Sequence, residues 1–275
     1  MLYNPKNGSL TLNNARMDYI RFGSGPKILI ILPGLGDGLT TVRGTALPMA
    51  LAYRMFARDY TVYMFSRREP LPNSFTTRDM ARDQKEAMDL LGIQKADILG
   101  VSMGGMIAQH LAADYPDRVG KLVLTVTGSR PNPTMVQSVQ LWMDMALRGD
   151  HTALMDSNVR AIYSDSYYRK NKWLVPVMGK LTKPKSYARF LTQAEACLNH
   201  NCYENLGKIL CPTLVIGGEQ DAVLGCEPSR ELAAQIPDAR LITYPQWGHG
   251  VYEEEKSFNA TVLSWLTEEE PVCTL

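Results

Sequence analysis

Apolar residues along this chain follow two alternating patterns, one with the period of a strand and one with the period of a helix. Runs such as KILIIL and YTVYMF are continuously apolar or β-branched, which is typical of strands buried on both faces. Glycine- and proline-containing turns close most of these runs. Strands are expected at residues 17–25, 27–34, 60–66, 96–101, 119–128, 211–218 and 239–245.

Segments with apolar residues at helical spacing lie between these runs. Helices are expected at residues 76–93, 103–116, 228–236 and 256–266. In the first of them, Thr76 or Thr77 is a suitable N-cap and Gly92 a suitable stop. Strands and helices that alternate at this pitch predict an α/β fold, with a mostly parallel sheet covered by helices on both faces. A chain of 275 residues is long enough for one such domain with an insertion.

Residues 130–205 depart from this alternation, because they lack buried-strand runs and carry helical patterns at 135–147 and 186–198. The segment leaves the sheet after a strand, at the edge where open α/β sheets bind ligands. We therefore expect a core at 1–129 and 206–275 and a helical cap, or lid, at 130–205. A second helical layer away from any site is the alternative. In a lid, Trp142 is a candidate substrate-binding residue. The excess of basic over acidic residues, together with the aromatic side chains of the segment, favours an anionic or aromatic ester. A solvated charged face over an ordinary amphipathic helix is the alternative interpretation.

The stretch GVSMGG places Ser102 between an expected strand and an expected helix. Gly100 and Gly104 allow a tight turn and close packing because neither has a Cβ atom. Such a turn exposes the hydroxyl and directs the free N–H groups of the helix N-terminus toward it. Ser102 is therefore the candidate nucleophile.

A serine hydroxyl needs a base, and the base needs an acid that orients it. Three of the four histidines lie in an expected helix or in the insertion: His110, His151 and His200. His249 instead occupies a glycine-flanked loop after the last expected strand, so it is the candidate base. Glu219 and Asp221 follow the strand before it, and we expect Asp221 to be the acid.

Stabilising an oxyanion takes two N–H donors. Met103, directly after the serine, is expected to supply one of them. The other is expected from Leu35, in the PGLGDG turn after the strand at 27–34. Gly34 lets this backbone approach a substrate closely, so it is also a candidate substrate-binding residue.

Composition narrows the range of partners. A formal net charge of +1 gives no electrostatic case for nucleic acid or an anionic membrane, and no apolar run is long enough for a membrane helix. The first 14 residues lack a signal-peptide pattern, so a cytoplasmic protein with reduced cysteines is expected. The odd set of five cysteines agrees with this: Cys197, Cys202, Cys211, Cys226 and Cys273. A zinc site is a minor alternative, with the ligands Cys197, His200, Cys202 and Cys211, but their spacing fits no common zinc pattern.

Three motifs in this order, GVSMGGMIAQHLAADYPDRVGKLVL, GEQDAVL and GHGVYEEEKSFNATVLSWL, closely resemble the α/β-hydrolase superfamily. The likeness is to its branch of small esterases, enol-lactonases and C–C bond hydrolases. It implies an eight-stranded sheet and a catalytic triad of Ser102, Asp221 and His249. The chain departs from the family in two places: Pro33-Gly34 replaces the usual His-Gly, and Arg67 and Arg68 replace an acidic residue and a glycine after the next strand.

The expected activity is hydrolysis of small carboxylic esters through an acyl-enzyme, without a cofactor or metal. Lactone or C–C bond hydrolysis on the same triad is the alternative, because the motifs do not separate these reactions. A slow or non-catalytic small-molecule receptor on the same fold is a third hypothesis. An NADP-dependent oxidoreductase is disfavoured, because Leu39 stands where a dinucleotide-binding turn needs its third glycine.

Overall fold

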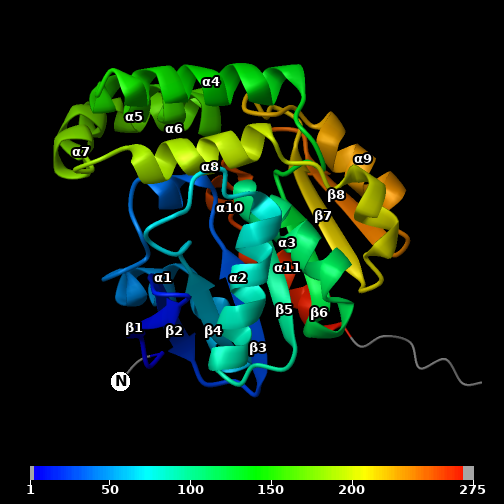
Figure 1. Cartoon of the computed structure of the whole chain (residues 1–275). Helices are drawn as coiled ribbons and strands as arrows, with labels where there is room; N and C mark the ends of the chain where they lie inside the picture. Colours follow the sequence, from blue (N-terminus) through cyan, green and yellow to red (C-terminus); the bar gives the residue numbers. More distant parts are fainter. Residues whose placement is uncertain (1–2, 269–275) are drawn as a thin grey trace, which may run out of the picture.

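The computed structural model describes residues 3–268, which form an eight-stranded sheet between two layers of helices (Figure 1). The strands are β1 (Lys6–Leu12), β2 (Ala15–Gly23), β3 (Lys27–Leu32), β4 (Tyr60–Phe65), β5 (Ala96–Val101), β6 (Val119–Thr125), β7 (Thr213–Gly218) and β8 (Ala239–Tyr244). Their order across the sheet is β1-β2-β4-β3-β5-β6-β7-β8. β1 and β2 pair antiparallel, as do β2 and β4, whereas all other neighbours are parallel. The predicted α/β class and mostly parallel sheet are confirmed.

Sequence patterns missed strand β1. Its sequence, KNGSLTL, contains only two apolar residues, and its burial alternates between exposed and half-buried along most of its length. An edge strand that packs on one face only needs no continuous apolar run. The hairpin with β2 therefore forms mainly through its ladder of backbone hydrogen bonds.

Helices cover both faces of the sheet. Strand side chains alternate between the faces, so Ile30 and Leu32 of β3 enter one apolar cluster while Leu29 and Ile31 enter the other. The first cluster includes α2 (Thr77–Leu90), α3 (Met103–Asp114) and α9 (Glu227–Gln235). The second includes α1 (Ala46–Ala52), η2 (Arg54–Arg58) and α11 (Phe258–Thr267), with α10 (Val251–Glu254) before it. The remaining short helices of the core are η1 (Leu35–Gly38), η3 (Pro116–Arg118) and η5 (Tyr203–Lys208).

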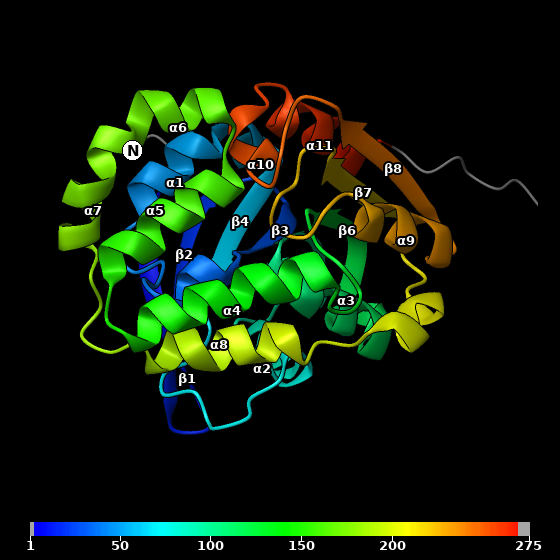
Figure 2. The same ribbon diagram turned by 90° about the horizontal axis from the view of Figure 1, so that it is seen from above.

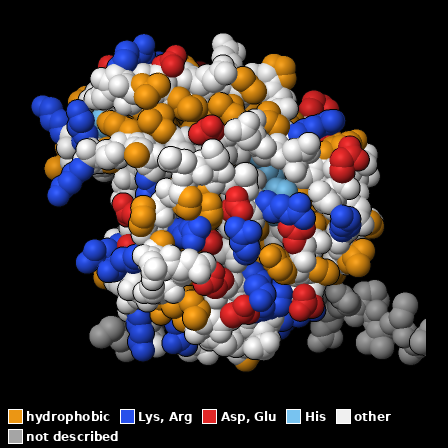
Figure 3. All heavy atoms as spheres, in the orientation of Figure 1, with side chains coloured by type: hydrophobic (Ala, Val, Ile, Leu, Met, Phe, Trp, Pro, Cys, Tyr) orange, Lys and Arg blue, Asp and Glu red, His pale blue; other side chains and the backbone are white. Residues whose placement is uncertain are grey.

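A group of helices between β6 and β7 forms a layer over one edge of the sheet, hereafter called the cap (Figure 2). Its elements are α4 (Pro133–Leu147), α5 (His151–Ile162), α6 (Asp165–Asn171), η4 (Lys172–Leu174), α7 (Val175–Leu181) and α8 (Ala188–Leu198). The cap leaves and rejoins the core at neighbouring points, since the Cys202 N–H donates to the Ser129 carbonyl at 2.8 Å. Apolar side chains gather on its outer surface in Figure 3, where Leu141 and Leu147 are exposed.

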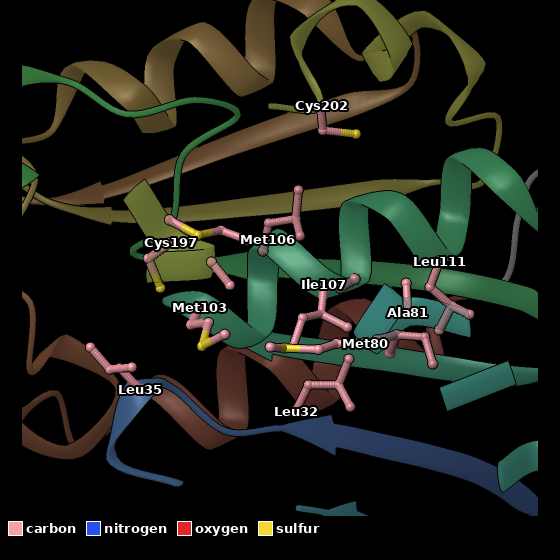
Figure 4. Packing of buried hydrophobic residues seen from close by; sticks show 14 of the residues in the cluster. Leu32, Leu35, Met80, Ala81, Met103, Met106, Ile107, Leu111, Cys197 and Cys202 are labelled. Carbon is pink, nitrogen blue, oxygen red and sulfur yellow. The ribbon is translucent and has the colours of Figure 1, made fainter. Parts of the chain in front are cut away.

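One apolar cluster joins the sheet, the helices and the cap. Figure 4 shows side chains from β3, the turn after it, α2, α3 and α8 within this cluster. Leu35 and Met103 belong to it, as do Phe190 and Cys197 of the cap. The two expected oxyanion donors therefore lie on backbone that is anchored by buried side chains.

Candidate active site

Ser102 occupies a sharp turn between β5 and α3, with φ 52° and ψ −119°. This left-handed conformation is strained for a residue with a side chain, and such strain is concentrated at functional sites. The two flanking glycines make the turn possible. A Cβ on Gly100 would lie 2.6 Å from the Gly105 Cα, and a Cβ on Gly104 would lie 1.9 Å from the Leu32 carbonyl oxygen. The half-buried Ser102 side chain thus stands at the N-terminus of an almost fully buried helix.

His249 and Asp221 form a buried hydrogen-bonded pair, with Nδ1 2.8 Å from Oδ2. Both side chains are at most 5% exposed. The other carboxylate oxygen, Oδ1, accepts from the N–H groups of Val223 at 2.8 Å and Leu224 at 3.0 Å. These bonds fix the carboxylate, which in turn fixes the imidazole and leaves its Nε2 as the nitrogen able to take a proton.

The three residues follow the carboxyl ends of parallel strands β5, β7 and β8, so they share one edge of the sheet. Within the described part of the chain, Ser102 Oγ and His249 Nε2 are not joined by a hydrogen bond. Contacts of this kind tighten in many enzymes only when substrate binds.

The expected oxyanion donors lie beside the serine. Leu35 and Met103 are each the first residue of a helix, so no preceding helical turn accepts from their N–H groups. Gly34 approaches the serine closely: a Cβ at this position would lie 3.4 Å from Ser102 Cβ and 3.9 Å from Oγ. The glycine therefore leaves space for a substrate carbonyl next to the hydroxyl.

Asp37, two residues after Leu35, is the centre of a buried ionic cluster that sequence reasoning missed. Its side chain is 1% exposed, and Oδ2 accepts from the Arg67 N–H at 3.1 Å and from Gln193 Nε2 at 3.3 Å. Arg189 Nη2 lies 2.5 Å from the same oxygen. Burial lowers the pKa of Arg67, while the nearby Asp37 carboxylate acts in the opposite direction.

Buried contacts also explain the two arginines that depart from the family pattern. Arg67 Nη2 donates to the Pro33 carbonyl at 2.6 Å. Arg68 lies 3.2 Å from Asp83 and stacks on the ring of Phe75. Both side chains make buried contacts within the protein. A role in binding the phosphate of a dinucleotide would not allow these contacts.

The other three histidines lie in packed surroundings. His200 Nδ1 is 2.8 Å from Thr77 Oγ1, and its ring meets the His110 ring edge-on at 5.1 Å. Burial lowers the pKa of His110 to about 4 and that of His200 to about 3, so both are neutral near pH 7. His151 is buried in the cap beside Thr182. Among residues 3–268, His249 is the one histidine with a carboxylate hydrogen-bonded to its ring.

The cap contacts the turn that carries His249. The Gly250 N–H donates to the Ile162 carbonyl at 2.6 Å, and Ser164 bonds to Glu254 through both its N–H and its hydroxyl. Trp142 is buried, and its indole N–H donates to Ser157 Oγ at 3.2 Å, from α4 to α5. These contacts give Trp142 a role in cap packing, and its expected role in substrate binding stays a prediction.

The described cysteines and histidines form no metal-binding group. Among residues 3–268, no three His, Cys, Asp or Glu side chains are arranged to hold a metal ion, so the alternative zinc ligands are not assembled. The four described cysteines are unpaired, and Cys273 lies outside the described residues. No helix in the same range combines the length and apolar character needed to span a bilayer.

The chain is similar to known proteins in both sequence and fold. A family model described as the alpha/beta hydrolase fold matches residues 27–256. A 2-hydroxy-6-oxononadienedioate/2-hydroxy-6-oxononatrienedioate hydrolase from Pseudomonas sp is 26% identical, covering 94% of this chain and 92% of the relative. The putative carbamate hydrolase RutD from Caulobacter sp. (strain K31) is 27% identical, covering 90% of this chain and 92% of the relative.

A solved structure supports the same fold. The enol-lactonase from Burkholderia xenovorans LB400 superimposes with a TM-score of 0.80 at 23% identity, covering 95% of this chain and 100% of that one. At this identity, the similarity concerns the fold alone.

Proposed function

Because this chain belongs to the alpha/beta-hydrolase-fold family, we propose that it is a serine hydrolase with Ser102, His249 and Asp221 as its catalytic triad. The observation that carries the proposal is the buried His249–Asp221 pair, which shares one sheet edge with a strained serine at a helix N-terminus. A packing role alone would require neither the strain at Ser102 nor the buried carboxylate on the imidazole.

The mechanism follows from the roles of these groups. Ser102 Oγ attacks the substrate carbonyl carbon while His249 Nε2 takes its proton, and Asp221 stabilises the imidazolium that forms. The N–H groups of Leu35 and Met103 hold the oxyanion. The tetrahedral intermediate collapses as His249 protonates the leaving group, and water then releases the acid from the acyl-enzyme.

The proposed substrates are small carboxylic esters. Hydrolysis of a C–C bond next to a carbonyl is the second candidate. It is favoured by the relative from Pseudomonas sp, which is named as a hydrolase of a 2-hydroxy-6-oxo dioic acid. Both reactions start at a carbonyl carbon and use the same oxyanion site, so one set of measurements compares them.

The first test is labelling with a fluorophosphonate and mapping of the adduct by mass spectrometry, together with turnover of p-nitrophenyl acetate, butyrate and octanoate. We expect the adduct on Ser102, and Ser102→Ala should lower kcat at least about 10³-fold without loss of fold. Ser264→Ala, an exposed serine on α11, is the control. Near-normal turnover by Ser102→Ala would refute the triad, whereas a Ser102 adduct with turnover of a 2-hydroxy-6-oxo-dienoate but of no ester would select the second candidate.

A further inference from the structure

The loop that offers the Leu35 N–H is rich in glycine. Residues 33–38, hereafter the oxyanion loop, read PGLGDG, with glycine at three of the six positions. Glycine loses more conformational freedom on ordering than any other residue. An oxyanion donor is effective only when its direction is fixed before the charge develops. Something outside the loop must therefore hold it.

The core holds the loop through Arg67. Its Nη2 donates to the Pro33 carbonyl at 2.6 Å, and its backbone N–H donates to Asp37 Oδ2 at 3.1 Å. One residue thus contacts the loop on both sides of Leu35. These bonds leave the Asp37 carbonyl oxygen for another donor, and Oδ2, as a carboxylate oxygen, can accept more than one.

The cap supplies those donors from α8. Arg189 Nη1 donates to the Asp37 carbonyl oxygen, and Nη2 donates to Asp37 Oδ2 and to the Arg67 carbonyl at 3.0 Å. The helix also lies directly on the loop, because a Cβ on Gly38 would come within 2.8 Å of the Phe190 Cα. The Arg189 side chain is 11% exposed, so its bonds are shielded from competing water.

We propose that Arg189 is a positioning residue, through which cap helix α8 holds the oxyanion loop in its catalytic conformation by way of Asp37. The cap is then part of the machinery that stabilises the transition state as well as a cover over the site. This inference rests on the proposed serine hydrolase function.

The charges around Asp37 indicate which substitution tests the proposed role of Arg189. Two guanidiniums, Arg67 and Arg189, surround one carboxylate, Asp37. Removing Asp37 would leave two buried cations without a carboxylate partner, and uncompensated buried charges strongly destabilise a fold. Arg189→Met instead leaves Asp37 and Arg67 as a balanced pair, and the unbranched side chain fills similar space. It is therefore the informative substitution.

The experiment measures kcat and KM of Arg189→Met on the p-nitrophenyl ester that the wild type hydrolyses fastest. It also measures inhibition by an alkyl boronic acid, which forms a tetrahedral anion on the serine. We expect kcat to fall about 10- to 100-fold with KM within about twofold. Affinity for the boronic acid should fall by a similar factor, while affinity for the unreactive ether analogue of the ester stays unchanged. Arg189→Lys, which keeps the charge but not the forked geometry, should restore part of kcat.

Arg160→Met is the matched control, since Arg160 lies on the same cap but pairs with Asp156 at 2.7 Å and stacks on Tyr168. Its kinetics should equal those of the wild type. Unchanged kcat in folded Arg189→Met, or a raised KM at unchanged kcat, would overturn the inference. Should Arg189→Met fail to fold, wild-type kinetics in Arg189→Lys would overturn it equally. The proposed function is tested separately, because it fails if the wild type takes no label on Ser102.

Discussion

Asp221 divides its two carboxylate oxygens between two tasks. Oδ1 accepts from two backbone N–H groups, and Oδ2 bonds the His249 ring. Asp221→Asn keeps an oxygen for the backbone but presents an amide N–H₂ to Nδ1, which favours the wrong imidazole tautomer. We expect kcat for esters to fall about 10³- to 10⁴-fold with little change in melting temperature, as followed by steady-state kinetics and circular dichroism.

Glu219→Gln provides the comparison for this substitution. Glu219 lies two residues earlier, on the same turn, and its carboxylate pairs with Arg230 at 2.8 Å on the surface. Exposed ion pairs contribute little to stability, so neither activity nor melting temperature should change appreciably. Comparable losses of kcat in both variants would show that the turn, and not the Asp221–His249 bond, is what matters.

Sequence reasoning reached Ser102, Asp221 and His249 because each follows a strand end within a recognisable local motif. It did not reach Asp37 or Arg189. Their link joins a turn at the sheet edge to a cap helix more than 150 residues later. Nothing in either local pattern encodes that contact, which depends on how α8 packs on the core. Arg67 and Arg68 were noticed as departures from a family pattern, but their partners became visible only in three dimensions.

At the scale of secondary-structure elements, the junction of β5 and α3 leaves little room for a larger side chain. A Cβ on Gly104 would overlap the Leu32 carbonyl oxygen at 1.9 Å, so Gly104→Ala must separate α3 from β3. We expect the free energy of unfolding to fall by about 3 kcal/mol. Activity should fall as well, because the same shift moves the Met103 N–H. Urea denaturation and ester kinetics check both effects.

Gly207→Ala makes the same substitution where space is open, since no atom lies within 4 Å of a Cβ at this position in η5. Its φ also lies outside the left-handed region, so alanine introduces no strain. We expect the unfolding free energy to be unchanged or raised by up to about 1 kcal/mol. Equal destabilisation of both variants would contradict the steric argument.

The elements differ in how far the sequence predicts them. Buried strands such as β3 and β4 were predicted within a few residues, because both faces need apolar side chains and the pattern is therefore continuous. β1 was missed for the opposite reason: six of its seven residues are exposed or half-buried. Leu12 is its one buried residue, and backbone pairing with β2 holds the rest of the strand, so this edge strand leaves little trace in the sequence.

For the molecule as a whole, stability should vary across the cap. Helix α4 buries Met135, Val139, Trp142 and Ala146, whereas α6 buries no residue. Few apolar contacts permit local opening. In hydrogen–deuterium exchange followed by mass spectrometry, we expect amides of α6 to exchange at least about tenfold faster than those of α4, with β5 slowest. Uniform protection throughout the cap would contradict this expectation.

The hydrogen bond between Cys202 and Ser129 has a consequence for how such proteins diversify. Because the cap starts and finishes at adjacent points, lengthening or replacing it adds little loop-closure entropy and leaves the register of β6 and β7 intact. A cap transplanted from a relative would nevertheless have to bring its own cation opposite Asp37, which limits the exchange to donors that carry one.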